Sequence, residues 1–264
     1  MKSRKQVSHW LTQTLPVVEE AGTVLQKFFR KNFEIREKEE AGLVTSADLA
    51  SEAILLDHFQ KLTPHFGILS EEAGSKKSLN PNSEGRWIID PLDGTTNFAH
   101  GFPMFCITLA LELEKQVVLG LTYHPIFKEW YTAIRGEGAR LNHKHLLRVS
   151  RRAQLREALL TTGFNYDRTT VKKEVERLSK VLANARAVRR EGSAALDLAY
   201  VARGVFDGFW EEGLSPWDVA AGALLIEEAG GKVTRFDGSP FSLDAEEILA
   251  ANLPLHPHLQ RAIR

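Results

Sequence analysis

One segment, residues 87–98, constrains this chain more than any other. It begins with the apolar run Trp87-Ile88-Ile89, which predicts a short buried strand. Pro91 and the following Gly-Thr-Thr-Asn sequence predict that the strand breaks there and turns into a helix start, with Asp90 and Asp93 around the break. Two carboxylates at the exit of a buried strand, beside exposed backbone N–H groups, can hold a hard cation and receive a phosphate.

An Asp-Gly pair alone more often marks a turn whose aspartate caps the next helix, so other acids have to decide between the two interpretations. Glu71 follows the apolar run 66–69, where a glutamate is ordinarily just solvated. Asp48 and Asp218 each stand three residues after a Thr or Ser at the start of a helical pattern, and a capping box would explain both without a metal. Glu71, Asp90, Asp93 and Asp218 together offer oxygen ligands and no thiol. Such a set suits Mg²⁺, with Mn²⁺ as a substitute.

The segment Asp90-Pro-Leu-Asp-Gly-Thr-Thr-Asn-Phe98 resembles the signature of the inositol monophosphatase family, the lithium-sensitive, magnesium-dependent phosphatases. Two more motifs are similar to that family and occur in its order. Upstream stands Gly67-Ile-Leu-Ser-Glu-Glu72, and downstream Trp217-Asp-Val-Ala-Ala-Gly222 with Glu228-Ala-Gly-Gly231. Three ordered motifs from about residue 45 to residue 231 are far more specific than one D-x-x-D-G-T.

The resemblance implies a site with two or three Mg²⁺ ions. Glu71 and Asp90, joined by the backbone carbonyl of Leu92, would hold the first and tighter ion. Asp90, Asp93 and Asp218 would hold a second. The Ser-Pro-Trp-Asp context of Asp218 also fits a helix start, but an aspartate in a first helical turn that faces the site can cap and coordinate together.

The resemblance also implies direct in-line attack by water on the phosphorus, without a phosphoenzyme. Thr95, with Asp48 behind it, would orient and activate this water, and the backbone N–H groups of Gly94 and Thr95 would bind the phosphate. The residues expected to contact the substrate are Glu71, Asp93, Gly94, Thr95, Gly192, Ser193, Ala194, Glu211 and Asp218. Glu212 follows Glu211, so which of these two glutamates points inward stays open.

Myo-inositol 1-phosphate is the substrate we expect, because Thr96-Asn97-Phe98 resembles the inositol phosphate branch, whereas the nucleotide branch usually has Lys-Glu at positions 96 and 97. A small phosphorylated polyol is thus the expected partner, and the resemblance adds a homodimer. The alternatives are a fructose-1,6-bisphosphatase, another small-molecule phosphatase of the family, or an added binding role in a transcription or RNA complex. The last has only basic stretches 148–156 and 186–190 in its favour, which are usually solvated faces.

Composition and charge argue against several classes of protein. Lysine plus arginine and aspartate plus glutamate both total 34 in 264 residues, so net charge drives binding to neither nucleic acid nor an anionic membrane. The lone Cys106 excludes an internal disulfide and predicts a buried core thiol. The N-terminus begins an amphipathic segment, and no apolar run approaches the roughly 18 residues of a membrane span. We therefore expect a cytoplasmic protein.

The order of the predicted elements favours an α+β fold: helices, then an antiparallel meander, then alternating helices and strands. Residues 1–145 would form an α+β half carrying most metal ligands, and residues 146–264 an α/β half completing the metal site and substrate pocket. Residues 75–86 read as a polar loop. The family's layered α-β-α-β-α sandwich, of the inositol monophosphatase and fructose-1,6-bisphosphatase type, is implied by the resemblance alone. The predicted helices are 7–28, 45–62, 171–182, 192–202 and 215–228.

Overall fold

The computed structural model describes residues 4–31, 34–37, 43–73, 85–165 and 169–264. Its helices are α1 (Arg4–Phe28), α2 (Ser46–Leu62), α3 (Thr95–Ala99), α4 (Val171–Leu182), α5 (Ala194–Ala202), α6 (Pro216–Glu228) and α7 (His256–Ile263), with a 3₁₀ turn at Leu155–Glu157. A small antiparallel pair joins β1 (Ile35–Glu37) to β2 (Leu43–Thr45). Most of the predicted 75–86 loop lies outside the described residues.

Two larger sheets carry the fold. The first has seven strands in chain order, parallel only between its first two members: β3 (Gly67–Ser70), β4 (Gly85–Asp93), β5 (Cys106–Leu113), β6 (Gln116–His124), β7 (Glu129–Ile134), β8 (Gly138–Leu141) and β9 (His145–Leu146). The second has the mixed order β11 (Ala187–Arg189), β10 (Leu159–Thr162), β12 (Gly208–Glu212), β14 (Glu247–Asn252) and β13 (Gly231–Thr234).

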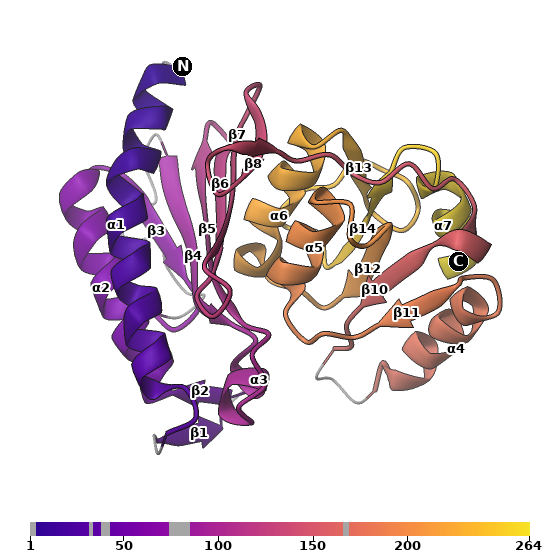
Figure 1. Ribbon diagram of the computed structural model, residues 1–264, viewed down its shortest axis with the longest axis horizontal. Helices are drawn as coiled ribbons and strands as arrows, with labels where there is room; N and C mark the ends of the chain where they lie inside the picture. Colours follow the sequence, from indigo (N-terminus) through magenta and orange to yellow (C-terminus); the bar gives the residue numbers. More distant parts are fainter. Residues whose placement is uncertain (1–3, 32–33, 38–42, 74–84, 166–168) are drawn as a thin grey trace.

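The elements stack in five layers (Figure 1). Helices α1 and α2 cover the outer face of the seven-stranded sheet, α5 and α6 lie between the two sheets, and α4 and α7 cover the far face of the five-stranded sheet. This arrangement confirms the expected α+β class and the α-β-α-β-α sandwich. The division of the chain at residue 145 stays a prediction, because one apolar cluster joins residues of both parts, such as Ile88 and Tyr131 with Leu198 and Leu224.

One expectation about local structure was wrong, and one helix was not predicted. The strand does not break at Pro91: β4 runs on to Asp93, and its pairing with β5 shifts register between Asp90 and Asp93. A proline is tolerated where the ladder is interrupted, because its missing N–H is not needed there. Helix α7, which was not predicted, has eight residues, and its buried Leu259 and Ile263 pack against the five-stranded sheet.

Helix α6 packs against both sheets, and it carries Asp218 in its first turn. It contacts strands β4 to β8 of one sheet and β13 of the other, so it is apolar on nearly every side. Its close approach to β6 depends on Gly120, where an added Cβ would lie 2.9 Å from the carbonyl oxygen of Ala221. The absence of a side chain at Gly120 therefore fixes the distance between α6 and the seven-stranded sheet.

We expect Gly120→Ala to lower the free energy of unfolding by about 1–3 kcal/mol, because the added methyl meets backbone atoms that cannot rotate away. Urea unfolding followed by circular dichroism measures this loss. Gln116→Val on the same strand adds a β-branched side chain at an exposed position and serves as the matched control. Equal stability of Gly120→Ala and the parent would contradict the packing argument.

Candidate active site

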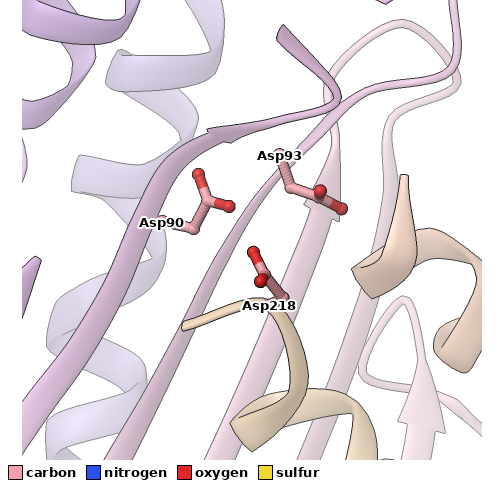
Figure 2. Close-up of side chains that lie close together, drawn as sticks. All are labelled: Asp90, Asp93 and Asp218. Carbon is pink, nitrogen blue, oxygen red and sulfur yellow. The ribbon is translucent and has the colours of Figure 1, made fainter. Parts of the chain in front are cut away.

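Three buried or half-buried aspartates meet at the junction between the seven-stranded sheet and α6 (Figure 2). Asp90 and Asp93 come from the end of β4, and Asp218 from the first turn of α6. One carboxylate oxygen of each lies within 4.8 Å of those of the other two. The structure thus brings together three of the predicted metal ligands, two from the end of β4 and one from a helix more than a hundred residues further along the chain.

The two aspartates of β4 are held by hydrogen bonds that leave other oxygens available. The backbone N–H of Leu92 donates to Oδ1 of Asp90 at 2.9 Å. Oδ2 of Asp93 accepts from the hydroxyl of Ser193 at 2.5 Å and from the backbone N–H of Ala195 at 2.9 Å. The start of α5 therefore orients Asp93, a function of Ser193 that the sequence analysis did not foresee.

The two aspartates for which capping was an open alternative do cap their helices. Asp218 accepts from the backbone N–H of Ser215 at 2.7 Å, in a capping box at the start of α6. Asp48 accepts from the backbone N–H of Thr45 at 2.9 Å, in a second capping box at the start of α2. Each cap uses one carboxylate oxygen, so the cap orients the side chain without consuming the other oxygen.

Thr95 links the start of α2 to the end of β4. Its hydroxyl lies 3.0 Å from Oδ1 of Asp48 and 3.0 Å from the carbonyl oxygen of Leu92. Gly94, which precedes it, has φ of 91°, and a Cβ there would lie 2.8 Å from the carbonyl oxygen of Met104. Only glycine fits this left-handed turn, which brings the Thr95 hydroxyl back over the strand end.

Glu71 lies directly after β3, beside this group. Its backbone N–H donates to the carbonyl oxygen of Ile89 at 3.2 Å, which continues the β3–β4 pairing by one residue. Its carboxylate is close enough to Asp90 for its charge and a hydrogen bond to raise the pKa of Asp90. Glu71, which follows β3, therefore lies next to the aspartates of the neighbouring strand β4.

The two glutamates at the end of β12 point to opposite faces of the five-stranded sheet. Glu212 forms ion pairs of 3.2 Å with both Lys173 and Arg177 of α4, on the outer face. Glu211 is buried over Gly163, where a Cβ would lie 2.2 Å from its carboxylate oxygens. Glu211, and not Glu212, is therefore directed away from α4.

The 192–194 turn lies against α3 and the end of β4. Gly192 has φ of 83°, and a Cβ at this position would meet the side-chain amide of Asn97 at 3.0 Å. The Asn97 amide donates to the carbonyl oxygens of Glu191 at 2.8 Å and Met104 at 2.7 Å. Asn97 thus connects the 87–98 segment to the 192–194 turn. Its position as a polar residue within the 87–98 segment was the sequence signal for this role.

Cys106 is buried, as expected, but it does not lie in a purely apolar core. Its thiol is 3.7 Å from Oδ2 of Asp93 and 3.8 Å from the hydroxyl of Ser193, directly behind the aspartate. Burial and the nearby carboxylates raise the pKa of the thiol well above its ordinary value. Cys106 is therefore a neutral packing partner of Asp93.

Burial dominates the electrostatics of the carboxyl groups. It raises the pKa of Asp90 and Asp218 well above the ordinary value, and neighbouring carboxylates raise it further. Burial also raises the pKa of Asp48 and of Asp93 to about 6, although hydrogen bonds to each oppose this shift. The pKa of Glu211 rises to about 8 for the same reason, with Arg190 opposing.

A divalent cation fits this donor set. Asp90, Asp93 and Asp218 offer only oxygen atoms, the preferred ligands of Mg²⁺ and Ca²⁺. Among the ion pairs of the described residues, none joins a lysine or arginine to these three aspartates. Buried carboxylates that repel one another in this way are stabilised by a bound cation.

Residues of the two basic stretches meet at the β11 edge of the five-stranded sheet. Arg152 from the first stretch and Arg186 and Arg189 from the second line one open cleft at the β11 edge, together with Glu157. Arg152 is also paired with the buried Asp207 at 3.1 Å. Within the described part of the chain, no helix is both long and apolar enough to span a membrane.

Comparison with known proteins gives concordant matches. The model of the inositol monophosphatase family matches residues 6–264. The chain is 42% identical over 247 residues to inositol-1-monophosphatase of Mesorhizobium japonicum, covering 92% of each chain. It is 39% identical to Nus factor SuhB of Pseudomonas aeruginosa, covering 87% of this chain and 89% of that one. The crystal structure of extragenic suppressor protein suhB from Bartonella henselae superposes with a TM-score of 0.92 at 38% identity, covering 97% of this chain and 98% of that chain.

The raised pKa values predict how stability depends on pH when divalent cations are absent. Asp48 and Asp93 have a pKa of about 6 in the folded protein, against 3.8 for an unperturbed aspartate. Between these values the folded state binds more protons than the unfolded state, so stability falls as pH rises from about 4 to about 6. In EDTA at pH 7, Asp93→Asn should therefore raise the Tm by at least about 2 °C.

Thermal unfolding in EDTA between pH 4 and pH 8 measures this effect, and the difference between Asp93→Asn and the parent should shrink toward pH 4. Asp244→Asn, at an exposed position, is the control and should leave the Tm unchanged. A parent and an Asp93→Asn variant with parallel pH profiles would contradict the electrostatic interpretation.

Proposed function

The chain belongs to the inositol monophosphatase family, and we propose that it hydrolyses a phosphorylated polyol, with myo-inositol 1-phosphate as its preferred substrate and Mg²⁺ as its cofactor. The observation that carries this proposal is the cluster of Asp90, Asp93 and Asp218 within 4.8 Å, with Glu71 beside it. Inhibition by Li⁺, a homodimeric assembly, a cytoplasmic location and Mn²⁺ as a substitute cation come from the family resemblance and belong to the same proposal.

In this proposal Glu71, Asp90 and the carbonyl of Leu92 hold one cation, and Asp90, Asp93 and Asp218 hold another. Bound divalent cations would neutralise charge on the phosphoryl oxygens, lower the pKa of water and stabilise the leaving alkoxide. The chain's own contribution is to present these oxygens from three separate segments, namely the residue after β3, the end of β4 and the first turn of α6. Buried donors and acceptors keep their geometry during the reaction, so little reorganisation is needed.

Asp48 and Thr95 act on the attacking water. The hydroxyl of Thr95, 3.0 Å from Oδ1 of Asp48, can accept a hydrogen bond from water while it donates to the carboxylate. Asp48 has a pKa of about 6, so it is ionised at neutral pH and still basic enough to take a proton. Water would attack the phosphorus and pass a proton through Thr95 to Asp48. The bond from phosphorus to the ester oxygen would break, and the departing alkoxide would take a proton from solvent water to leave as the polyol.

Substrate contacts come from both sheets. The backbone N–H groups of Gly94 and Thr95 bind the phosphate at the start of α3, and the 192–194 turn lies beside the polyol ring. Glu211 accepts hydrogen bonds from polyol hydroxyls, which is the reason for preferring a neutral polyol over a second phosphate. A bisphosphate would place a second negative charge beside Glu211 and disfavour its ionisation further, so fructose 1,6-bisphosphate is the weaker candidate.

The test is phosphate release from inositol 1-phosphate, fructose 1,6-bisphosphate and 3′-phosphoadenosine 5′-phosphate, with and without Mg²⁺. Thr95→Ala removes the hydroxyl between water and Asp48 and should lower kcat about 10²- to 10⁴-fold. Thr95→Ser keeps that hydroxyl and should retain most of the activity. Absence of Mg²⁺-dependent turnover of all three substrates would overturn the proposal, and faster turnover of the bisphosphate would replace the preferred substrate.

Assayed above pH 8, where a Glu211 with a pKa of about 8 is ionised, Glu211→Gln should raise the KM for inositol 1-phosphate about tenfold, because a neutral amide accepts hydrogen bonds from hydroxyl groups more weakly than a carboxylate. The inhibition constant of inorganic phosphate, which has no polyol, should not change. Glu212→Gln is the matched control, since Glu212 faces α4 and pairs with Lys173 and Arg177. An equal rise in KM in both variants would count against a substrate contact by Glu211.

A second candidate function is an added binding role in a transcription or RNA complex. Two observations favour it: the 39% identity to a protein named Nus factor SuhB, and the cleft where Arg152, Arg186 and Arg189 converge. Salt-dependent retention on immobilised RNA, reduced by Arg186→Ala together with Arg189→Ala but not by Thr95→Ala, would support this role. Retention that is unaffected by either change would exclude this cleft as the RNA site.

A further inference from the structure

Helix α2 turns an unusual face toward the site. Asp48, Ser51 and Glu52 are all buried, with exposed fractions of 0%, 0% and 6%. Their spacing of three and four residues places them on one side of the helix. The same side continues into Leu55 and Phe59, which join the apolar core. The first two turns of α2 thus bury polar side chains where a helix ordinarily buries apolar ones, and buried polar groups require hydrogen-bond partners.

The partners of Glu52 lie on both sides of Glu71. Oε1 of Glu52 accepts hydrogen bonds from the hydroxyl of Ser70 and, at 2.9 Å, from the backbone N–H of Ala73. Glu71 lies between these two donors, and its own N–H is bonded to the carbonyl oxygen of Ile89 in β4 at 3.2 Å. The backbone of Glu71 is therefore fixed from β4 on one side and from α2 on the other.

Ser51 makes the corresponding contact with the end of β4. Its hydroxyl donates to the carbonyl oxygen of Pro91 at 2.8 Å. Pro91 lies between Asp90 and Asp93, where the pairing of β4 with β5 shifts register. Helix α2 thus supports the strand end at the point where the sheet itself supports it least. Ser51 and Glu52, adjacent in the second turn of α2, therefore hold two different backbone segments of the site.

We propose that Glu52 is a positioning residue, assisted by Ser51, which fixes Glu71 relative to the three aspartates and thereby sets the site's affinity for divalent cations. This inference rests on the proposed role of Glu71 as a metal ligand. Glu71 comes from β3, whereas Asp90, Asp93 and Asp218 come from β4 and α6, so their spacing depends on contacts between these elements. Cation affinity is sensitive to residues that orient the ligands without touching the ion.

A purely structural role of Glu52 makes a different prediction. If its hydrogen bonds only stabilised the fold, Glu52→Ala would lower the free energy of unfolding, but the folded variant would bind cations like the parent. If Glu52 orients Glu71, the folded variant itself binds cations more weakly. The readout must therefore be cation affinity under conditions in which every variant is folded, as shown by circular dichroism.

The experiment titrates the full chain with Mn²⁺ and measures free Mn²⁺ by electron paramagnetic resonance. Glu52→Ala should raise the Kd for Mn²⁺ about 10- to 100-fold. Glu52→Gln keeps an acceptor oxygen for Ser70 and Ala73 and should stay within about threefold of the parent. Glu112→Ala is the control, because Glu112 pairs with Arg86 at the opposite end of β4 and should leave the Kd unchanged.

A double variant shows whether Glu52 acts through Glu71. If it does, Glu52→Ala should add nothing to the weakened Mn²⁺ binding of Glu71→Gln. An undiminished penalty in that background, or a Kd for Glu52→Ala equal to that of the parent, would overturn the positioning role while leaving the metal site intact. A parent chain that binds no Mn²⁺ would overturn the proposed function itself, and this inference with it.

Discussion

The mutual repulsion of buried carboxyl groups is the constraint on which the rest of the site depends. Asp90, Asp93 and Asp218 lie within 4.8 Å of one another, and burial and like charges raise the pKa of all three. Such an arrangement costs stability unless protons or cations compensate it. Hydrogen bonds from backbone or hydroxyl donors partly offset this cost, and they determine where the oxygens of each aspartate lie. In the proposed function, a cation would therefore meet ligands that are already in place.

The same anchors join the two large sheets. Asp93 belongs to the seven-stranded sheet but accepts its hydrogen bonds from Ser193 and Ala195 at the start of α5. Asn97 of α3 reaches the carbonyl oxygen of Glu191, and α6 carries Asp218 while it packs between the sheets. Neither sheet contains a complete set of ligands. The geometry of the site therefore depends on the packing of the middle-layer helices against both sheets.

Two aspartates of the site lie in the first turn of a helix, and the same capping interaction holds both. The first N–H groups of a helix need acceptors, so an aspartate at the third helical position is held in a capping box. Asp48 in α2 and Asp218 in α6 both use one oxygen for this purpose, and Asp48 keeps the other close to Thr95. Capping and chemistry are therefore compatible. Helix α2 extends this principle, because Ser51 and Glu52 use later positions of the same face to hold other backbone segments.

The sequence by itself determined the elements and the chemical character of the site. Local patterns predicted α4 at its observed bounds, and the D-x-x-D-G-T segment identified the strand end with its two aspartates. Tertiary structure decided what depends on contacts between distant residues. Only the sheet register shows that β4 passes through Pro91, only the two faces of β12 separate Glu211 from Glu212, and only the packing of α2 on β3 gives Glu52 its partners. Periodicity reports the neighbours of a residue along the chain, whereas the energy of a buried polar group is set by its neighbours in space.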